Sequence, residues 1–430
     1  MAVGGDGHFH LGGALWRPCG VNYTPSSGIA QENDDLYQRW MDPPAYDPET
    51  VERDLYHIQN LGINAVSAWV YPTDGAWQNL LDFLRRCRAH HLKVSLMLAP
   101  DVASTGAADT LKPLVERFRL PQNDTVIAYE IAWEPEFNGH DARRAMDDVW
   151  QKWVSTHYGS IEAAKAAWQA KIPRDAGGKV TNPSDADLAR PDGPEARVCA
   201  AYRRFLDDWV ADRYGPVVRR LHEIDPHHAV SFRMNHAGDP TDRDGMPYGF
   251  EGVSRATDYL APEGYGRVGG WAEVRPGWFT AAYARAVAPD KPLVWAEVGT
   301  SVWDEAAVAP APETLAFQGR FYDDFFHMAT ASGADGLFFW WFAGGYRFGE
   351  GSDYGLINPD GTDRPSSLAV RRNAAAFLSA PAPAAPDVWL PFDRDAYGNG
   401  LVGVYDALSV PFWSAIVQGH RPGLRAKPAR

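Results

Sequence analysis

The stretch IAYEIAWEP at residues 127–135 decides the fold, because it has the form of a buried strand that ends in an acid. Its apolar residues form a nearly continuous run, which is typical of a parallel strand covered on both faces. Glu130 lies inside the run and Glu134 lies at its carboxyl end. A second stretch, LVWAEVG at residues 293–299, delivers Glu297 to its end in the same way. Two acids placed like this predict chemistry that uses a pair of carboxylates.

Similar apolar runs recur along the chain with helix-like segments between them. We expect eight strands, at residues 15–23, 63–71, 92–99, 126–133, 229–234, 258–261, 293–297 and 336–341. Helix signals fit the alternation, since Asp47 and Pro48 open an amphipathic run that stops before Gly62. The sequence therefore predicts an α/β fold, a (β/α)8 TIM barrel.

The connection after the fourth strand, residues 137–228, is much longer than the others. We expect it to contain helices at 150–157, 161–170 and 195–224. Such a segment is an insertion on the catalytic rim or a small subdomain. We therefore predict one barrel over residues 1–379, including this insertion. A linker and a short C-terminal extension follow at 380–430, which either pack against the barrel or begin a further domain.

Composition indicates an ordinary globular protein, with 45% hydrophobic residues in 430 and a net charge of −14. The acidic balance speaks against nucleic acid or an anionic membrane as a partner. The first residues lack the form of a secretory signal, so we expect a cytoplasmic protein unless a leader precedes them. Cys19, Cys87 and Cys199 are too scattered for a disulfide framework. Composition leaves the oligomeric state open.

The carboxyl ends of barrel strands converge, so Glu134 and Glu297 are expected to face each other across the barrel mouth. Hydrolysis of a glycosidic bond needs a proton donor and a second carboxylate that attacks the anomeric carbon or activates water. Glu136 is a rival proton donor, but it follows Pro135 and has left the strand. The histidines lack ligand spacing, so we predict neither a metal nor a cofactor.

These segments resemble the retaining glycoside hydrolases of clan A, especially the cellulases and mannanases of family 5. Residues 128–135 are similar to the family's Asn-Glu-Pro motif, and residues 291–299 to its seventh-strand motif. The resemblance covers roughly residues 8–375 and implies that Glu134 is the general acid/base and Glu297 the nucleophile. Part of the insertion, residues 153–168, is more similar to the β-galactosidases of family 42.

Three positions depart from the family pattern. Trp133 stands where an Asn contacts the sugar 2-hydroxyl, Ser67 where an Arg is usual, and Glu263 where a His lies two residues before Tyr265. Losing the Asn contact costs transition-state stabilisation unless another group replaces it. Candidates to replace it are Glu263, Asn235 and His236.

Aromatic residues are abundant, at 13% with 17 Trp, and several follow strands, where a sugar could stack on them. Core packing explains many of them equally well. The resemblance implies that Tyr265 hydrogen-bonds the nucleophile and that Trp340 floors the −1 subsite. We predict a substrate-binding set of Asn22, Trp69, Trp133, Asn235, His236, Glu263, Tyr265, Trp303 and Trp340.

The sequence thus predicts a retaining enzyme that hydrolyses β-linked glycosides or short oligosaccharides. Two alternatives stay open. A non-catalytic barrel that binds carbohydrate would explain the three departures, and a transglycosylase would use the same two carboxylates.

Overall fold

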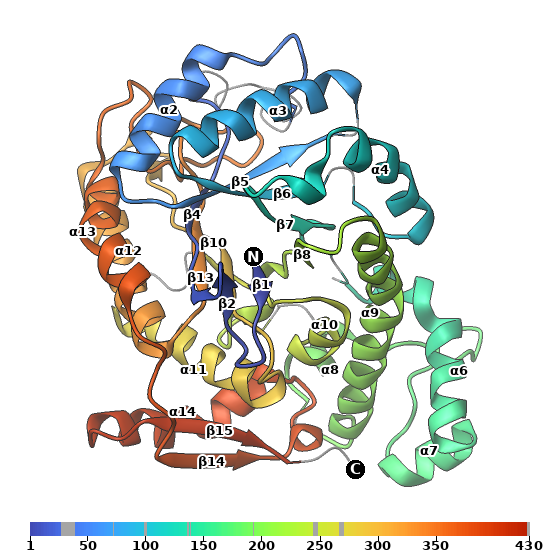
Figure 1. Cartoon of the computed structure of the whole chain (residues 1–430). Coiled ribbons are helices and arrows are strands. Elements are labelled where there is room, and N and C mark those ends of the chain that lie inside the picture. The colour runs from blue at the N-terminus through green and yellow to red at the C-terminus, as the bar shows by residue number, and fades with distance from the viewer. Residues whose placement is uncertain are drawn as a thin grey trace.

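A curled sheet of eight parallel strands, with helices around it, forms the centre of the computed structural model (Figure 1). The structure describes residues 1–26, 39–71, 73–98, 101–135, 137, 139–191, 193–243, 248–265 and 271–427. The strand order is β8-β7-β6-β5-β4-β13-β10-β9. The strands are β4 (Cys19–Asn22), β5 (Ala65–Val70), β6 (Lys93–Leu98), β7 (Val126–Glu130), β8 (Ala229–Ser231), β9 (Glu263–Tyr265), β10 (Val294–Gly299) and β13 (Gly336–Phe339). This arrangement confirms the predicted barrel fold.

The sixth barrel strand is displaced from its predicted position. We expected it at 258–261, but β9 begins at Glu263, after Pro262. The earlier segment nonetheless bridges the edge strand β8 and the residues just before β10. The Asp258 N–H donates to the Val230 carbonyl at 2.9 Å, and the Leu260 N–H donates to the Pro292 carbonyl at 2.9 Å. The predicted strand therefore closes the barrel, and the residues that follow it carry the pairing with β10 toward the mouth.

Most helices of the barrel lie outside the sheet and follow the expected signals. They are α2 (Pro48–Asn60), α3 (Asp74–Ala89), α4 (Thr105–Arg117), α10 (Phe250–Ala256), α11 (Trp271–Val287), α12 (Pro312–Ser332) and α13 (Pro365–Ser379), with the 3-10 turns η1 (Leu120–Gln122) and η3 (Asn235–Gly238). The Asp47 side chain accepts the Glu49 and Thr50 N–H groups, as a helix-capping residue does. Gly333 ends α12 with a φ of 71°, which glycine adopts without strain.

The long insertion is helical. It holds α5 (His140–Arg143), η2 (Arg144–Met146), α6 (Asp147–Tyr158), α7 (Ile161–Trp168), α8 (Asp185–Ala189) and α9 (Ala196–Ile224). The Trp150 ring of α6 stacks on Trp168 of α7 and meets Tyr202 of α9 edge-on, at 6.1 and 5.2 Å between ring centroids. This aromatic packing fixes α6 and α7 on the outer side of α9 (Figure 1). The helix expected at 161–170 ends at Trp168, because Gln169 adopts a φ of 55°.

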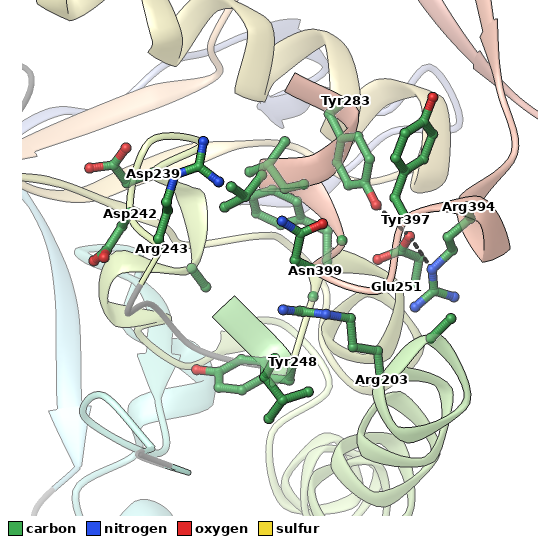
Figure 2. A pocket seen from close by; sticks show the side chains of 18 of the residues that line it. Arg203, Asp239, Asp242, Arg243, Tyr248, Glu251, Tyr283, Arg394, Tyr397 and Asn399 are labelled. Carbon is green, nitrogen blue, oxygen red and sulfur yellow. Dashed lines mark hydrogen bonds and ion pairs between the residues drawn. The ribbon is translucent and has the colours of Figure 1, made fainter. Parts of the chain in front are cut away.

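The C-terminal extension packs against the barrel helix α11. It contains β14 (Val388–Phe392), η4 (Arg394–Ala396), α14 (Leu401–Val417) and β15 (Pro422–Ala426), and its two strands pair in parallel. The Phe279 ring of α11 contacts Tyr405 and Phe412 at 5.0 and 5.1 Å. A polar pocket lies between the extension, α9 and α10 (Figure 2). Its described lining includes His236 but none of the acids that follow or lie on β7, β9 and β10.

An N-terminal antiparallel sheet covers the amino end of the barrel. Its strands are β1 (Ala2–Val3), β2 (Phe9–Leu11) and β3 (Ala14–Leu15). Phe9 is buried in a cluster with apolar residues of five barrel strands, Ala65, Ile127, Ala128, Ala229, Val294, Ala296 and Phe338. In Figure 1 this small sheet lies over the middle of the barrel. Among the described helices, none has the length and apolar character needed to cross a bilayer.

Candidate active site

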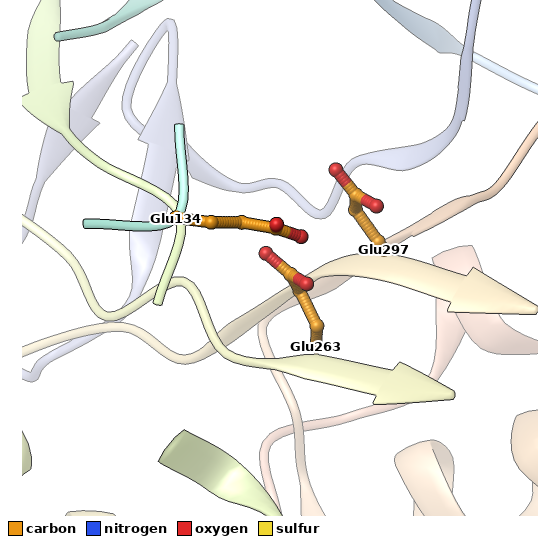
Figure 3. Close-up of side chains that lie close together, drawn as sticks. All are labelled: Glu134, Glu263 and Glu297. Carbon is orange, nitrogen blue, oxygen red and sulfur yellow. The ribbon is translucent and has the colours of Figure 1, made fainter. Parts of the chain in front are cut away.

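Three glutamates meet at the carboxyl ends of the barrel strands. Glu134 follows β7, Glu263 begins β9 and Glu297 lies on β10. One carboxylate oxygen from each lies within 4.8 Å of the other two (Figure 3). The structure therefore brings together Glu134 and Glu297, which the sequence predicted as a pair, and adds Glu263 to them.

Glu134 reaches the site through an unusual backbone conformation. β7 ends at Glu130, and Glu134 has a φ of 52°, in the left-handed region that residues other than glycine rarely adopt. The preceding Trp133 N–H donates to the Asp101 carboxylate at 3.1 Å, which fixes the start of this turn. Strained backbone of this kind is concentrated at functional sites, because surrounding structure must hold it in place.

Glu297 is 1% exposed and accepts two hydrogen bonds from side chains. The Arg233 guanidinium donates through Nη1 to one carboxylate oxygen, and the Tyr265 hydroxyl donates to the other. Burial raises the pKa of Glu297 to about 7, Arg233 opposes that rise, and the nearby Glu134 adds to it. The carboxylate is thus held in a fixed orientation and ionises near neutral pH.

Arg233 is the functional residue that the sequence prediction missed. It is 0% exposed, and its Nε donates to Glu130 at 2.6 Å. Its Nη2 donates to Asn22 Oδ1 and Ser67 Oγ, both at 2.7 Å. An arginine inside the apolar run 229–234 was the available signal, because a buried guanidinium needs anionic partners. Arg233 lies just after β8, and its guanidinium reaches Ser67, the position on β5 where the family pattern has an arginine.

Glu263 is also 1% exposed, and one of its oxygens, Oε1, accepts the Asn235 N–H at 3.2 Å. The other oxygen, Oε2, has no hydrogen-bond donor within the described part of the chain. Burial raises the pKa of Glu263 well above its usual range, and the negative charges of Glu297 and Glu134 raise it further.

Three predicted tryptophans gather beside the glutamates. The Trp69 ring meets the rings of Trp133 and Trp340 at 5.1 and 5.7 Å, and Trp133 lies 6.0 Å from Trp340. Trp69 and Trp340 are each 2% exposed, so mutual packing covers most of their surface. Trp133 is half-buried and has more surface open to a ligand.

Two of the other predicted binding residues, Asn22 and Asn235, support the buried network, whereas His236 is partly exposed. Asn22 is fully buried, and its Nδ2 donates to the carbonyls of Ala296 and Phe339, so it supports the network from below. Asn235 holds Glu263 through its backbone N–H. His236 keeps 37% of its side chain exposed, with its ring 6.1 Å from that of Tyr265.

Trp303 lies on the short strand β11 (Trp303–Asp304), which pairs with β12 (Ala309–Pro310), and its ring packs on Tyr346 at 4.3 Å. Its backbone N–H donates to Ser301 Oγ, so the interactions of Trp303 among the described residues are with its own loop and with Tyr346. Glu136, the rival proton donor, lies outside the described residues.

Glu134, Glu263 and Glu297 also form the one group of potential metal ligands among the described residues. Their oxygens are close enough to share a cation. Both oxygens of Glu297, however, already accept hydrogen bonds from Arg233 and Tyr265. These bonds suit a carboxylate that reacts with a substrate rather than one that binds a metal. An acidic cluster alone does not make a metal site, because such sites also need a defined coordination geometry.

Comparisons with known proteins agree with this architecture. No family model matches the sequence, and no curated protein does. A GH5_18 enzyme from Streptomyces cattleya, solved as a variant in complex with Manβ1-4GlcNAc, has a TM-score of 0.63 at 16% identity, over 95% of this chain and 94% of that one. No comparison confirms the predicted family 42 character of the insertion.

Two further solved structures are similar. The exo-β-1,4-mannosidase Op5Man5 from Opitutaceae bacterium strain TAV5 has a TM-score of 0.55 at 17% identity, over 100% of this chain and 73% of that one. A β-galactosidase from the haloarchaeon Halorubrum lacusprofundi has a TM-score of 0.63 at 18% identity, over 90% of this chain and 66% of that one. The chain therefore has the barrel fold of these glycoside hydrolases.

Proposed function

We propose that the protein is a retaining glycoside hydrolase, with Glu134 as the general acid/base and Glu297 as the nucleophile. The observation that carries the proposal is the approach of these two carboxylates, whose oxygens lie within 4.8 Å of each other. Retaining enzymes hold their two carboxyl groups about 5–5.5 Å apart, whereas inverting enzymes leave about 6.5–9.5 Å for a water molecule. The short separation favours direct attack by a carboxylate.

In the first step, a Glu297 oxygen attacks the anomeric carbon while the bond from that carbon to the leaving oxygen breaks. Glu134 gives its proton to the leaving oxygen, which departs as an alcohol. In the second step, Glu134 removes a proton from water as the water oxygen attacks the same carbon. The ester bond to Glu297 breaks, and both carboxyl groups return to their starting states.

The residues around Glu297 fit the nucleophile role. Hydrogen bonds from Arg233 and Tyr265 hold both of its oxygens and stabilise the ionised form that attacks. Glu130 and Asn22 hold Arg233 in turn, so the nucleophile belongs to a network that spans the barrel interior. Such support gives the orientation that an in-line attack requires.

The substrate class follows from the similar structures and from the mouth of the barrel. A GH5_18 enzyme bound to Manβ1-4GlcNAc, an exo-mannosidase and a β-galactosidase share this fold, which supports β-linked mannosides, galactosides or short oligosaccharides as substrates. Trp133 is only half-buried, so part of its ring is open to a sugar at the position where the family pattern has an asparagine.

A panel of aryl β-glycosides tests the proposal, with mannoside, galactoside, glucoside and N-acetylglucosaminide members. Wild type is expected to release the aryl alcohol from at least one member, and Glu297→Ala to lose that activity. Glu134→Gln is the matched control, because an activated aryl leaving group needs little protonation and its first step should persist. Sugar binding without turnover of any member would instead indicate a non-catalytic barrel. Transfer of the sugar to added acceptors in place of water would indicate a transglycosylase.

A further inference from the structure

Glu263 has no role in the two-carboxylate mechanism, although it lies beside the two catalytic acids. It pairs directly with Glu297 across the parallel strands β9 and β10. In Figure 3 its carboxylate points toward that of Glu134. A third acid buried at this position needs an explanation, because an isolated buried carboxylate is strongly destabilising unless it is paired or protonated.

Among the described residues, Glu263 has no hydrogen bond to a cationic side chain. Arg233, which lies just after β8, faces the same space and lowers the pKa of Glu263, but its hydrogen bonds go to Glu130, Glu297, Asn22 and Ser67. The other titratable groups facing it are the acids Glu134 and Glu297, the Tyr265 hydroxyl, which donates to Glu297, and the partly exposed His236. These neighbours make the site rich in acid.

The two carboxylate oxygens of Glu263 differ in their hydrogen bonding. Oε2 is buried and has no donor within the described residues, while Oε1 accepts the Asn235 N–H. A proton held between Glu263 and Glu134 would supply the missing hydrogen bond and remove the repulsion between two like charges. We infer that Glu263 and Glu134 form a carboxyl pair that shares one proton, which makes Glu263 a positioning residue for the acid/base. This inference rests on the proposed function.

The pair accounts for each proton in the reaction. Before the first step the pair holds one proton and Glu297 is ionised. The proton leaves from Glu134 to the departing oxygen, so the pair becomes doubly charged while Glu297 becomes a neutral ester. Repulsion within the pair then makes Glu134 a stronger base toward water. The proton taken from water restores the singly protonated pair when the ester breaks.

The pH profile of kcat/KM tests the pair, using Glu263→Gln. This change keeps the size of the side chain and the acceptor for the Asn235 N–H, but it removes the carboxyl group of Glu263 from the pair. We expect the alkaline limb to move down by about one pH unit or more. Glu263→Asp retains a carboxyl group and should recover part of that shift. Glu251→Gln, in the separate pocket of Figure 2, is the matched control and should leave the profile unchanged. An unchanged alkaline limb in Glu263→Gln overturns the inference.

Infrared difference spectroscopy gives a readout that does not depend on turnover. A protonated carboxyl band should persist in wild type well above the usual glutamate pKa of about 4.3, and both Glu263→Gln and Glu134→Gln should change it. If wild type turned over no glycoside but showed this band, the proposed function would fail and the pair would stand. Loss of the band near the usual glutamate pKa overturns the pair. Circular dichroism of each variant verifies that it is folded.

Discussion

The two ends of the barrel are built from the same strands and have opposite chemistry. At the amino end, Phe9 packs on Ile127 of β7 and Val294 of β10 in an apolar cluster. At the carboxyl end, the same two strands present Glu130 and Glu297, which share one buried arginine. A distance of three residues along each strand separates hydrocarbon packing from an ionic network.

This contrast indicates which end stabilises the protein and which end performs its chemistry. The apolar end tolerates other side chains of similar volume, since its contribution depends on packing. The charged end does not, because removal of one partner leaves another charge buried and unpaired. Sites that hold such networks generally give up stability for function. Substitutions at the two ends should therefore have separable effects.

The largest expected effect is on activity at the charged end. Glu297→Ala should lower kcat by about 10⁴-fold or more, because it removes the carboxylate that is proposed to form the glycosyl-enzyme. Its melting temperature should stay near that of wild type, since Arg233 keeps Glu130 as an anionic partner and the change also removes an acid whose ionised form burial disfavours. Steady-state kinetics measures kcat, and thermal denaturation measures the melting temperature. A large loss of both activity and stability would show that the two ends are not separable.

The second effect is on stability at the apolar end. Phe9→Ala should lower the free energy of unfolding by about 3–5 kcal/mol, because it leaves a cavity in the cluster that covers the barrel. The kcat of the folded variant should change little. Urea denaturation gives the free energy of unfolding, and assays well below the melting temperature give kcat. A loss of kcat as large as that of Glu297→Ala would contradict the separation.

Arg233→Lys tests whether the shape of the guanidinium matters beyond its charge. Lysine keeps the positive charge but cannot donate at once to Glu130, Glu297 and Asn22 in the same geometry. We expect kcat to fall by about 10²-fold, as misplacement of a reacting group does. The assay should use an activated aryl glycoside, so that attack by Glu297 limits the rate. A variant with wild-type kcat would mean that the charge alone suffices.

The pH dependence should show the raised pKa of the nucleophile. Glu297 attacks only when ionised, and burial raises its pKa to about 7, so kcat/KM should rise with pH through an acid limb near that value. The folded pKa lies above the usual 4.5, so this group's contribution to stability should decrease as pH rises from about 4.5 to about 7. The difference in unfolding free energy between wild type and Glu297→Gln measures it. An acid limb near pH 4.5 would refute the prediction.

The smallest expected effect concerns the ring of Trp133. Trp133→Phe keeps an aromatic ring but reduces the half-buried surface beside Trp69 and Trp340. We expect kcat/KM to fall about two- to tenfold, because a smaller ring offers a sugar less surface to stack on. Steady-state kinetics and thermal denaturation measure activity and stability separately. A lower melting temperature with an unchanged kcat/KM would place the role of Trp133 in packing.

The sequence predicted the barrel and its two catalytic candidates because both depend on local pattern. Continuous apolar runs mark parallel strands, and strand ends converge in every such barrel. The hydrogen-bond network that supports these two acids was harder to predict from the sequence. Arg233 contacts residues far away in the chain, and no local pattern states which acids it meets. Asn22 has the residue type of a sugar contact, but the fold uses its amide to bind backbone carbonyls.

The position of the sixth strand shows the same limit. The apolar run at 258–261 predicts a strand, and the run does close the barrel through hydrogen bonds to Val230 and Pro292. The pairing that places Glu263 beside Glu297 comes from the next residues, which have no apolar pattern. Register between strands therefore decided the composition of the site, and register depends on tertiary contacts.

The most direct test of the central claim is to trap the covalent intermediate and locate it. A 2-deoxy-2-fluoro glycoside with an activated leaving group slows both steps, because fluorine destabilises the positively charged transition state, and the glycosyl-enzyme accumulates. Proteolysis and mass spectrometry then identify the labelled residue. We expect one equivalent of sugar on Glu297. Label on Glu263 or Glu134, or turnover of a glycoside with inversion at the anomeric carbon, would contradict it.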